Sequence, residues 1–260
     1  MEQLLAKLTN LGYELFGIFI PGIVALIFLL IWWASIGQIA PYISNGFFPQ
    51  LTSKNASEII ESITVRTGFG IALPIFIITY FLGHMLQWIS RSGKASDQIL
   101  KSPILRTYKS ICLQIPKPEN SYDARLEPLF AAVQSKFMCD GTYLSWPQFY
   151  PIAKNYLSRS SHQSLVTNYQ NKYTLHRSIT LASAGLFWLC VAGMIAEGII
   201  LYNIGVSPRW WLVAPLTLFS VISVWGFSDS YAYNWNFFGN SIITESYSLI
   251  YGPKNAESKP

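Results

Sequence analysis

The feature that most constrains this chain is the run from Leu15 to Ser53, which contains no Asp, Glu, Lys, Arg or His. Its first part reads LFGIFIPGIVALIFLLIWW. About 20 apolar residues in a helix, at 1.5 Å per residue, span the roughly 30 Å hydrocarbon core of a bilayer. A signal peptide is the alternative, but this stretch is longer than its apolar region and ends in Trp32 and Trp33 rather than at a small-residue cleavage site. We therefore expect residues 15 to 35 to cross a membrane.

The composition extends this expectation to the whole chain. Hydrophobic residues make up 51% and charged residues 12% of the 260 residues, whereas soluble domains average about 25% charged residues. Four segments are long and apolar enough to span a bilayer. The sequence predicts an all-α integral membrane protein with four transmembrane helices, at about residues 15–35, 69–90, 179–202 and 210–228.

Three of these segments contain proline. Pro21, Pro74 and Pro215 each remove a backbone donor, and lipid tolerates this only where neighbouring helices or hydroxyl groups satisfy the freed carbonyl. We expect the three prolines to bend their helices. Gly17 and Gly22 flank Pro21 and are expected to let another helix approach closely.

The basic residues predict the orientation. Twelve of the eighteen Lys and Arg residues lie between the second and third segments. Arg91, Lys94 and Lys101 lie near the start of this connection, and Lys172 and Arg177 lie near its end, where the positive-inside rule applies. We therefore expect a multi-pass protein with this region and both termini in the cytoplasm. The first three are also candidates for contact with anionic lipid headgroups.

The same pattern divides the chain. The connection of nearly ninety residues is long enough for a small domain, and apolar residues recur in it at helical spacing. Helices are expected at about residues 122–138 and from about Pro147, and a third is expected from Ser164 into the third span. The predicted parts are an N-terminal transmembrane hairpin (1–90), a cytoplasmic helical domain (91–178), a C-terminal transmembrane hairpin (179–230) and a cytoplasmic amphipathic tail (231–260).

Ionisable residues inside spans are functional candidates, because they are costly there unless paired or hydrated. Only His84 and Glu197 qualify. His84 either lines a pore or senses pH, or else it bonds to a neighbouring helix or reaches the headgroups. Glu197 either selects cations in a ring of charges or extends to the outer interface.

Hydroxyl groups form a third set of candidates. Thr217, Ser220 and Ser223 follow one another at three-residue spacing in the fourth span. Such a stripe can line a conduction path, bond the carbonyl freed by Pro215, or hold helices together.

No catalytic or cofactor motif is present, so we do not expect an enzyme. The TGFG at residues 67–70 lacks the preceding strand and the Lys-Ser/Thr of a phosphate loop. Three cysteines, Cys112, Cys139 and Cys190, show no metal-ligand spacing, and Cys190 is expected to fill space in a helix. The dispersed basic residues leave nucleic acid only as a weak or indirect partner.

Several short stretches together carry a resemblance. The order of YELFGIFIPGIVAL (13–26), YFLGHMLQWIS (80–90), YTLHRSITLASAGLF (173–187) and the aromatic tail is similar to a broad group of bacterial inner-membrane proteins, some from anti-phage defence operons. The helix count resembles that of the channel-forming component of Hailong-type systems and of the four-helix component of Kiwa-type systems. The resemblance implies a homo-oligomer that a cytosolic partner from the same operon opens, so that the membrane depolarises.

Two functions follow as expectations. The first is an oligomeric, gated channel or pore of the bacterial inner membrane, controlled through its cytoplasmic domain. The alternative is a membrane anchor or sensor that recruits a cytosolic partner without forming a pore. A third, a small transporter, is weakened by the lack of an internal repeat.

Overall fold

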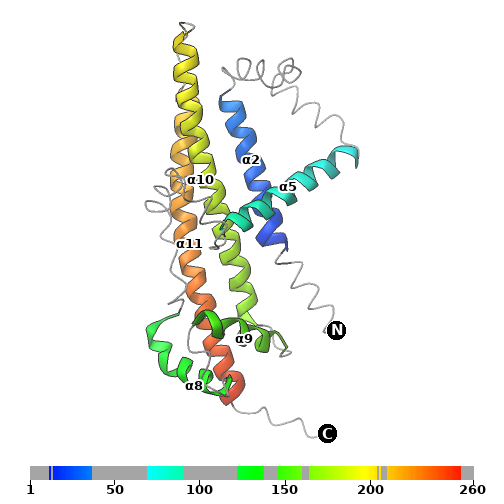
Figure 1. Cartoon of the computed structure of the whole chain (residues 1–260), viewed down its shortest axis with the longest axis vertical. Coiled ribbons are helices and arrows are strands. Elements are labelled where there is room, and N and C mark those ends of the chain that lie inside the picture. The colour runs from blue at the N-terminus through cyan, green and yellow to red at the C-terminus, as the bar shows by residue number, and fades with distance from the viewer. Residues whose placement is uncertain are drawn as a thin grey trace. The chain divides into compact units, whose positions relative to one another are not determined.

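The computed structural model describes residues 12, 14–36, 69–90, 122–137, 146–159, 164–203, 205 and 210–252. Within these ranges every regular element is helical, and the elements are labelled in Figure 1. Four helical segments are long and apolar enough to cross a membrane, which is the pattern of a multi-pass membrane protein. In chain order the elements are η1 (Leu15–Phe19), α2 (Ile20–Ser35), α5 (Phe69–Ser90), η3 (Ala124–Leu126), α8 (Glu127–Phe137), α9 (Trp146–Arg159), α10 (Leu165–Asn203) and α11 (Trp210–Tyr251).

The first three spans agree with the prediction. The segment expected at 15–35 comprises η1 and α2, and the second is α5. The third is part of α10, which begins at Leu165 and so forms the unbroken helix expected from Ser164 onward.

The fourth helix is longer than predicted. The predicted span covers about residues 210–228, but the helix α11 continues to Tyr251. A charged residue ends an apolar span without ending a helix, and no proline follows until Pro253, directly after Gly252. Beyond Asp229 buried side chains recur at helical spacing, which keeps this part of the helix packed on one side; they include Tyr231, Trp235, Phe238 and Ile242.

The chain forms two compact units. One comprises Glu14–Leu113 and Leu175–Ser228, contains most of the apolar span residues, and is called the membrane unit below. The other comprises Met1–Tyr13, Gln114–Thr174 and Asp229–Pro260, and is called the aromatic unit. Both α10 and α11 contribute residues to each unit, so the predicted tail from residue 231 belongs to the same unit as α8 and α9.

Two glycines bring α2 and α5 together in the membrane unit. A Cβ atom on Gly22 would overlap the backbone carbonyl of Thr79, and one on Gly83 would overlap the carbonyl of Ile18. The helices cross at this point (Figure 1), and ring contacts such as Phe19 with Phe76, 5.2 Å between centroids, extend the contact. The close approach expected at Gly22 is therefore present, with Gly83 as its counterpart.

The other helices of the membrane unit pack as an antiparallel pair with α2 against them. Leu186, Cys190 and Leu201 of α10 form a buried cluster with Val213 of α11 and Ile36 at the end of α2. The indole N–H of Trp32 donates a hydrogen bond to the carbonyl of Leu189, at 2.7 Å. This bond ties α2 to the middle of the third span.

The core of the aromatic unit is built from α8, α9 and the parts of α10 and α11 that belong to it. Phe130, Trp146, Phe149 and Phe238 are buried in one cluster. The first three rings meet edge-to-face or tilted, which is typical of aromatic packing. Short polar contacts fix the periphery: Asn240 accepts the Asp123 backbone N–H at 2.8 Å, and the Tyr251 hydroxyl donates to the Ala132 carbonyl at 3.1 Å.

Candidate functional site

Glu197 is the most unusual residue of the membrane unit. Its side chain is fully buried, and neither carboxylate oxygen accepts a hydrogen bond from the part of the chain that the structure describes. It lies one turn beyond Gly193, on the face of α10 that packs against α2 and α11. The side chain therefore points into the packed interior rather than onto the surface of this chain.

The hydroxyl groups of α11 are occupied locally. The Thr217 hydroxyl donates to the Val213 carbonyl at 2.9 Å, and the Ser220 hydroxyl donates to the Thr217 carbonyl at 2.6 Å. Pro215 has no N–H, so the carbonyl of Trp211, four residues earlier, lacks its helical donor. Neither hydroxyl bonds to this carbonyl. Ser220 and Ser223 are buried and Thr217 is half-buried, so all three lie on the packed side of α11.

Two further buried residues of α10, Ser183 and Cys190, were not among the candidates predicted from the sequence. Ser183 and Cys190 are both fully buried, and they precede Glu197 at seven-residue intervals. Residues seven apart lie on nearly the same face of an α-helix. The Cys190 thiol also contacts the Thr217 hydroxyl across the α10–α11 boundary. In the sequence, only the seven-residue spacing indicates that these residues share a face with Glu197. Ser183 and Cys190 carry no charge, so they do not stand out within an apolar span.

His84 lies apart from this set. It is exposed on α5, where its ring meets that of Tyr80 edge-on, 4.5 Å between centroids. The structure therefore does not bring His84 together with Glu197, Thr217, Ser220 and Ser223 in one buried site.

The three prolines lie in the first two turns of their helices. Pro21 is buried and follows directly on the π-helical turn η1, in which the Ile20 N–H bonds to the Leu15 carbonyl. Pro74 and Pro215 are exposed within α5 and α11, and each helix continues through its proline. Their bending role stays a prediction. The candidate lipid contacts Arg91, Lys94 and Lys101 lie outside the described residues.

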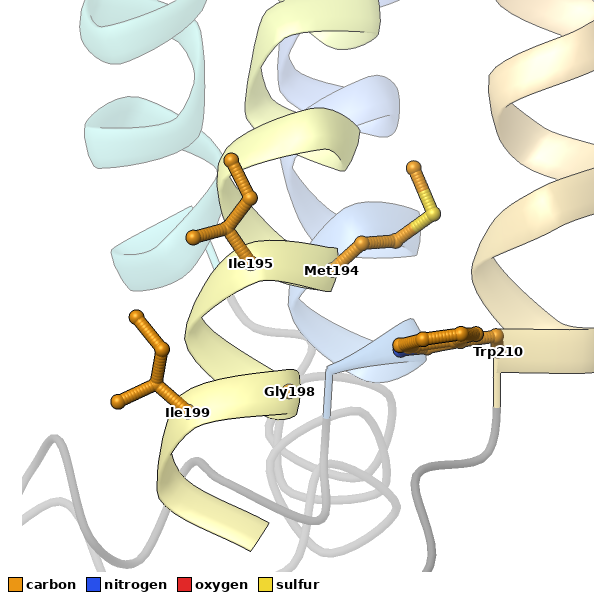
Figure 2. Close-up of a pocket in the computed structure, with 5 residues that line it drawn as sticks. All are labelled: Met194, Ile195, Gly198, Ile199 and Trp210. Carbon is orange, nitrogen blue, oxygen red and sulfur yellow. The ribbon is translucent and has the colours of Figure 1, made fainter. Parts of the chain in front are cut away.

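A hollow of about 300 Å³ lies on another face of α10 (Figure 2). The Trp210 ring reaches from the start of α11 to Gly198, and Met194, Ile195 and Ile199 complete the lining. The lining is almost entirely apolar, so the hollow suits hydrocarbon and offers no chemistry. Among the described residues, no group of three or more His, Cys, Asp and Glu side chains is placed to hold a metal ion.

No protein-family model, curated protein or solved structure matches this chain.

Proposed function

We propose that the chain is a gated membrane effector of the bacterial inner membrane, with its permeation pathway closed in this conformation. The positive-inside asymmetry supports cytoplasmic placement of residues 91 to 178 and of both termini. The resemblance to membrane components of anti-phage defence operons supports a role in depolarising the membrane.

The observation that carries the proposal is the burial of Glu197 without a partner. An unpaired polar group in a packed interior costs about 1–3 kcal/mol relative to an apolar residue of similar size. A purely structural helix contact gains nothing from this cost, whereas an intramembrane acid is a usual component of an ion or proton path.

Control through the cytoplasm is supported by the course of two helices. Residues 165–174 of α10 and 229–251 of α11 belong to the aromatic unit, and the same helices continue into the membrane unit. A partner protein that binds the aromatic unit and shifts either helix would also shift residues in the span. We expect this partner to be encoded beside the effector.

Assembly into a homo-oligomer remains part of the proposal. The outward face of α10 carries Gly185 and Ala192 among exposed Ile195 and Ile199. Small residues on a lipid-facing helix let a second copy approach closely.

The test is current across a planar bilayer that contains the purified full-length chain, with and without the neighbouring gene product. We expect partner-dependent current in the wild type and its loss in Glu197→Gln. Glu14→Gln is the matched control, because Glu14 is exposed at the start of η1 and should leave the current unchanged. No current in the presence of a bound partner would overturn the proposal.

One observation favours the second candidate, a membrane anchor or sensor without a pore. The Thr217 and Ser220 hydroxyls bond to their own backbone, as they would in a helix that only packs. This candidate predicts that the aromatic unit binds the partner and that no current is measured. Glu197→Gln should change neither result.

A further inference from the structure

The buried face of α10 carries three groups in a line. Ser183, Cys190 and Glu197 are each 0% exposed and are separated by seven residues. At 1.5 Å per residue the line is roughly 21 Å long, which is most of the thickness of a hydrocarbon core. We call these three residues, with Thr217, Ser220 and Ser223 of α11, the polar seam.

The seam contains polar atoms that nothing in the described chain satisfies. The Ser183 hydroxyl and both carboxylate oxygens of Glu197 are buried and have no hydrogen-bond partner among the described residues. Buried groups of this kind are usually satisfied by internal water, which forms two to four hydrogen bonds in such places. Two such groups, Ser183 and Glu197, therefore lie at opposite ends of the line.

We propose that the polar seam is a proton pathway within a single subunit, with Glu197 as its proton-binding group. This inference rests on the proposed function and assigns its permeant species and its route. Water enters the seam when α2 moves away from α10, a hydronium ion gives its proton to the Glu197 carboxylate, and the carboxyl group returns it to the next water in the line.

The packing of the seam favours protons over metal cations. A sodium or potassium ion must exchange its water for several oxygen ligands at once, and the seam offers one carboxylate and separate hydroxyls. A proton needs only one acceptor at each step. The cluster that contains Cys190 includes Phe28, Trp32, Trp33 and Ile36 from α2 and its end, and Val213 and Leu216 from α11, and none of these side chains titrates.

Gly193 keeps the seam closed, because its lack of a side chain lets the end of α2 pack against α10. It lies between Cys190 and Glu197, and a Cβ atom there would come within 2.9 Å of Ile36 Cγ2 and 3.2 Å of Trp32 Nε1. A larger side chain at position 193 therefore pushes the end of α2 away from the seam. Gly226 on the exposed face of α11 has nothing within 4 Å of such an atom and supplies the matched control.

The first experiment measures proton entry into liposomes that contain the full-length chain and a pH-sensitive dye, driven by a potassium gradient with valinomycin. We expect Gly193→Leu to raise the proton flux several-fold over wild type, and Gly226→Leu to leave it unchanged. Adding Glu197→Gln to Gly193→Leu should return the flux to the wild-type level, and adding Ser183→Ala should reduce it. If Gly193→Leu does not fold, Trp32→Phe replaces it, because this change removes the bond to Leu189 without adding bulk.

A second measurement reports on the seam without any flux. In a Cys112→Ser, Cys139→Ser background, Cys190 is the only thiol. We expect a small methanethiosulfonate reagent to modify it in the Gly193→Leu protein but not in the Gly226→Leu protein.

The outcomes separate the two proposals. Partner-dependent current that is carried by potassium, or that is indifferent to Glu197→Gln and Ser183→Ala, would overturn the proton seam and leave a channel. Cys190 that stays unreactive while Gly193→Leu passes protons would place the path elsewhere. Absence of current in the opened variants and in the partner-bound wild type would overturn the proposed function itself.

Discussion

At the scale of single residues, glycine has opposite effects on stability at different positions. Gly22 and Gly83 lie where two helix backbones meet, whereas Gly185 and Gly226 face open space. Glycine lowers helix stability by about 1 kcal/mol relative to alanine. At a backbone contact this cost is offset, because no larger residue fits there.

The first prediction concerns these glycines. Gly22→Ala should destabilise the protein by about 1–3 kcal/mol, because the added methyl group overlaps the Thr79 carbonyl. Gly185→Ala should instead stabilise it by up to about 1 kcal/mol. Thermal unfolding of both variants in one detergent measures the difference, and equal shifts would contradict the crossing at Gly22.

The second prediction concerns Glu197. Replacing it with leucine should raise the free energy of unfolding by about 1–3 kcal/mol, since an unpaired buried carboxyl group is removed. The same change should abolish the current or proton flux. A stability gain combined with a loss of function is the signature of a group retained for activity. A loss of stability would show that Glu197 has a structural partner.

At the scale of elements, a side chain of α11 caps the N-terminus of α10. Glu245 of α11 accepts the Leu165 backbone N–H at 2.9 Å and the Ser164 hydroxyl at 2.7 Å. Ser164 in turn accepts the Val166 N–H at 3.2 Å. These bonds satisfy donors at the start of α10 that an α-helix leaves free, and they fix α10 and α11 in antiparallel register within the aromatic unit.

The third prediction tests this cap. Glu245→Ala should cost about 0.5–2 kcal/mol, in the range of a lost N-cap. The effect should be local, with faster hydrogen exchange at Leu165 and Val166. Asp229→Ala, an exposed position on the same helix, is the control and should leave both amides protected. Unchanged exchange in Glu245→Ala would show that the cap does not stabilise α10.

The fourth prediction concerns pH. Burial, and secondly the hydrogen bond to Glu127, raise the pKa of Tyr122 from its ordinary value near 10 to about 12. The folded-state pKa is raised, so the stabilising contribution is complete below pH 10 and is lost as the pH rises through 12. Stability curves of wild type and Tyr122→Phe should converge over this window. A constant difference between the two curves would contradict the assignment.

At the scale of the whole molecule, the membrane unit has polar groups inside and apolar groups outside. Ser183, Glu197 and Ser220 are buried, while Ile77, Phe81 and Trp225 are more than half exposed. A soluble domain shows the reverse, because its outer surface faces water. Hydrocarbon as the surrounding solvent accounts for both observations.

The fifth prediction concerns orientation. Protease added to inverted inner-membrane vesicles should cut within residues 91–178, and protease added to spheroplasts should leave this region intact. The reason is the concentration of Lys and Arg next to the second and third spans. The opposite pattern would reverse the orientation and would place the partner outside the cell.

Helix number and position could be predicted from the sequence, because apolar length and helical spacing are local properties. The spans at 15–35 and 69–90 and the continuous helix from Leu165 needed no tertiary information. The fourth span was predicted to end at about residue 228, whereas the helix continues to Tyr251, because a charge stops an apolar run without breaking the backbone hydrogen bonds of a helix.

The amino-acid sequence alone establishes that four segments are long and apolar enough to cross a membrane and that Glu197 is an acid within one of them. Only the tertiary structure decided that Glu197 points inward, that Ser183 and Cys190 share its face, and that Gly22, Gly83 and Gly193 mark the close contacts. The physical reason is that span formation depends on the free energy of moving a segment into lipid, which its own residues set. Burial of one side chain depends on which neighbouring helix covers that face, and this is a property of the packed molecule.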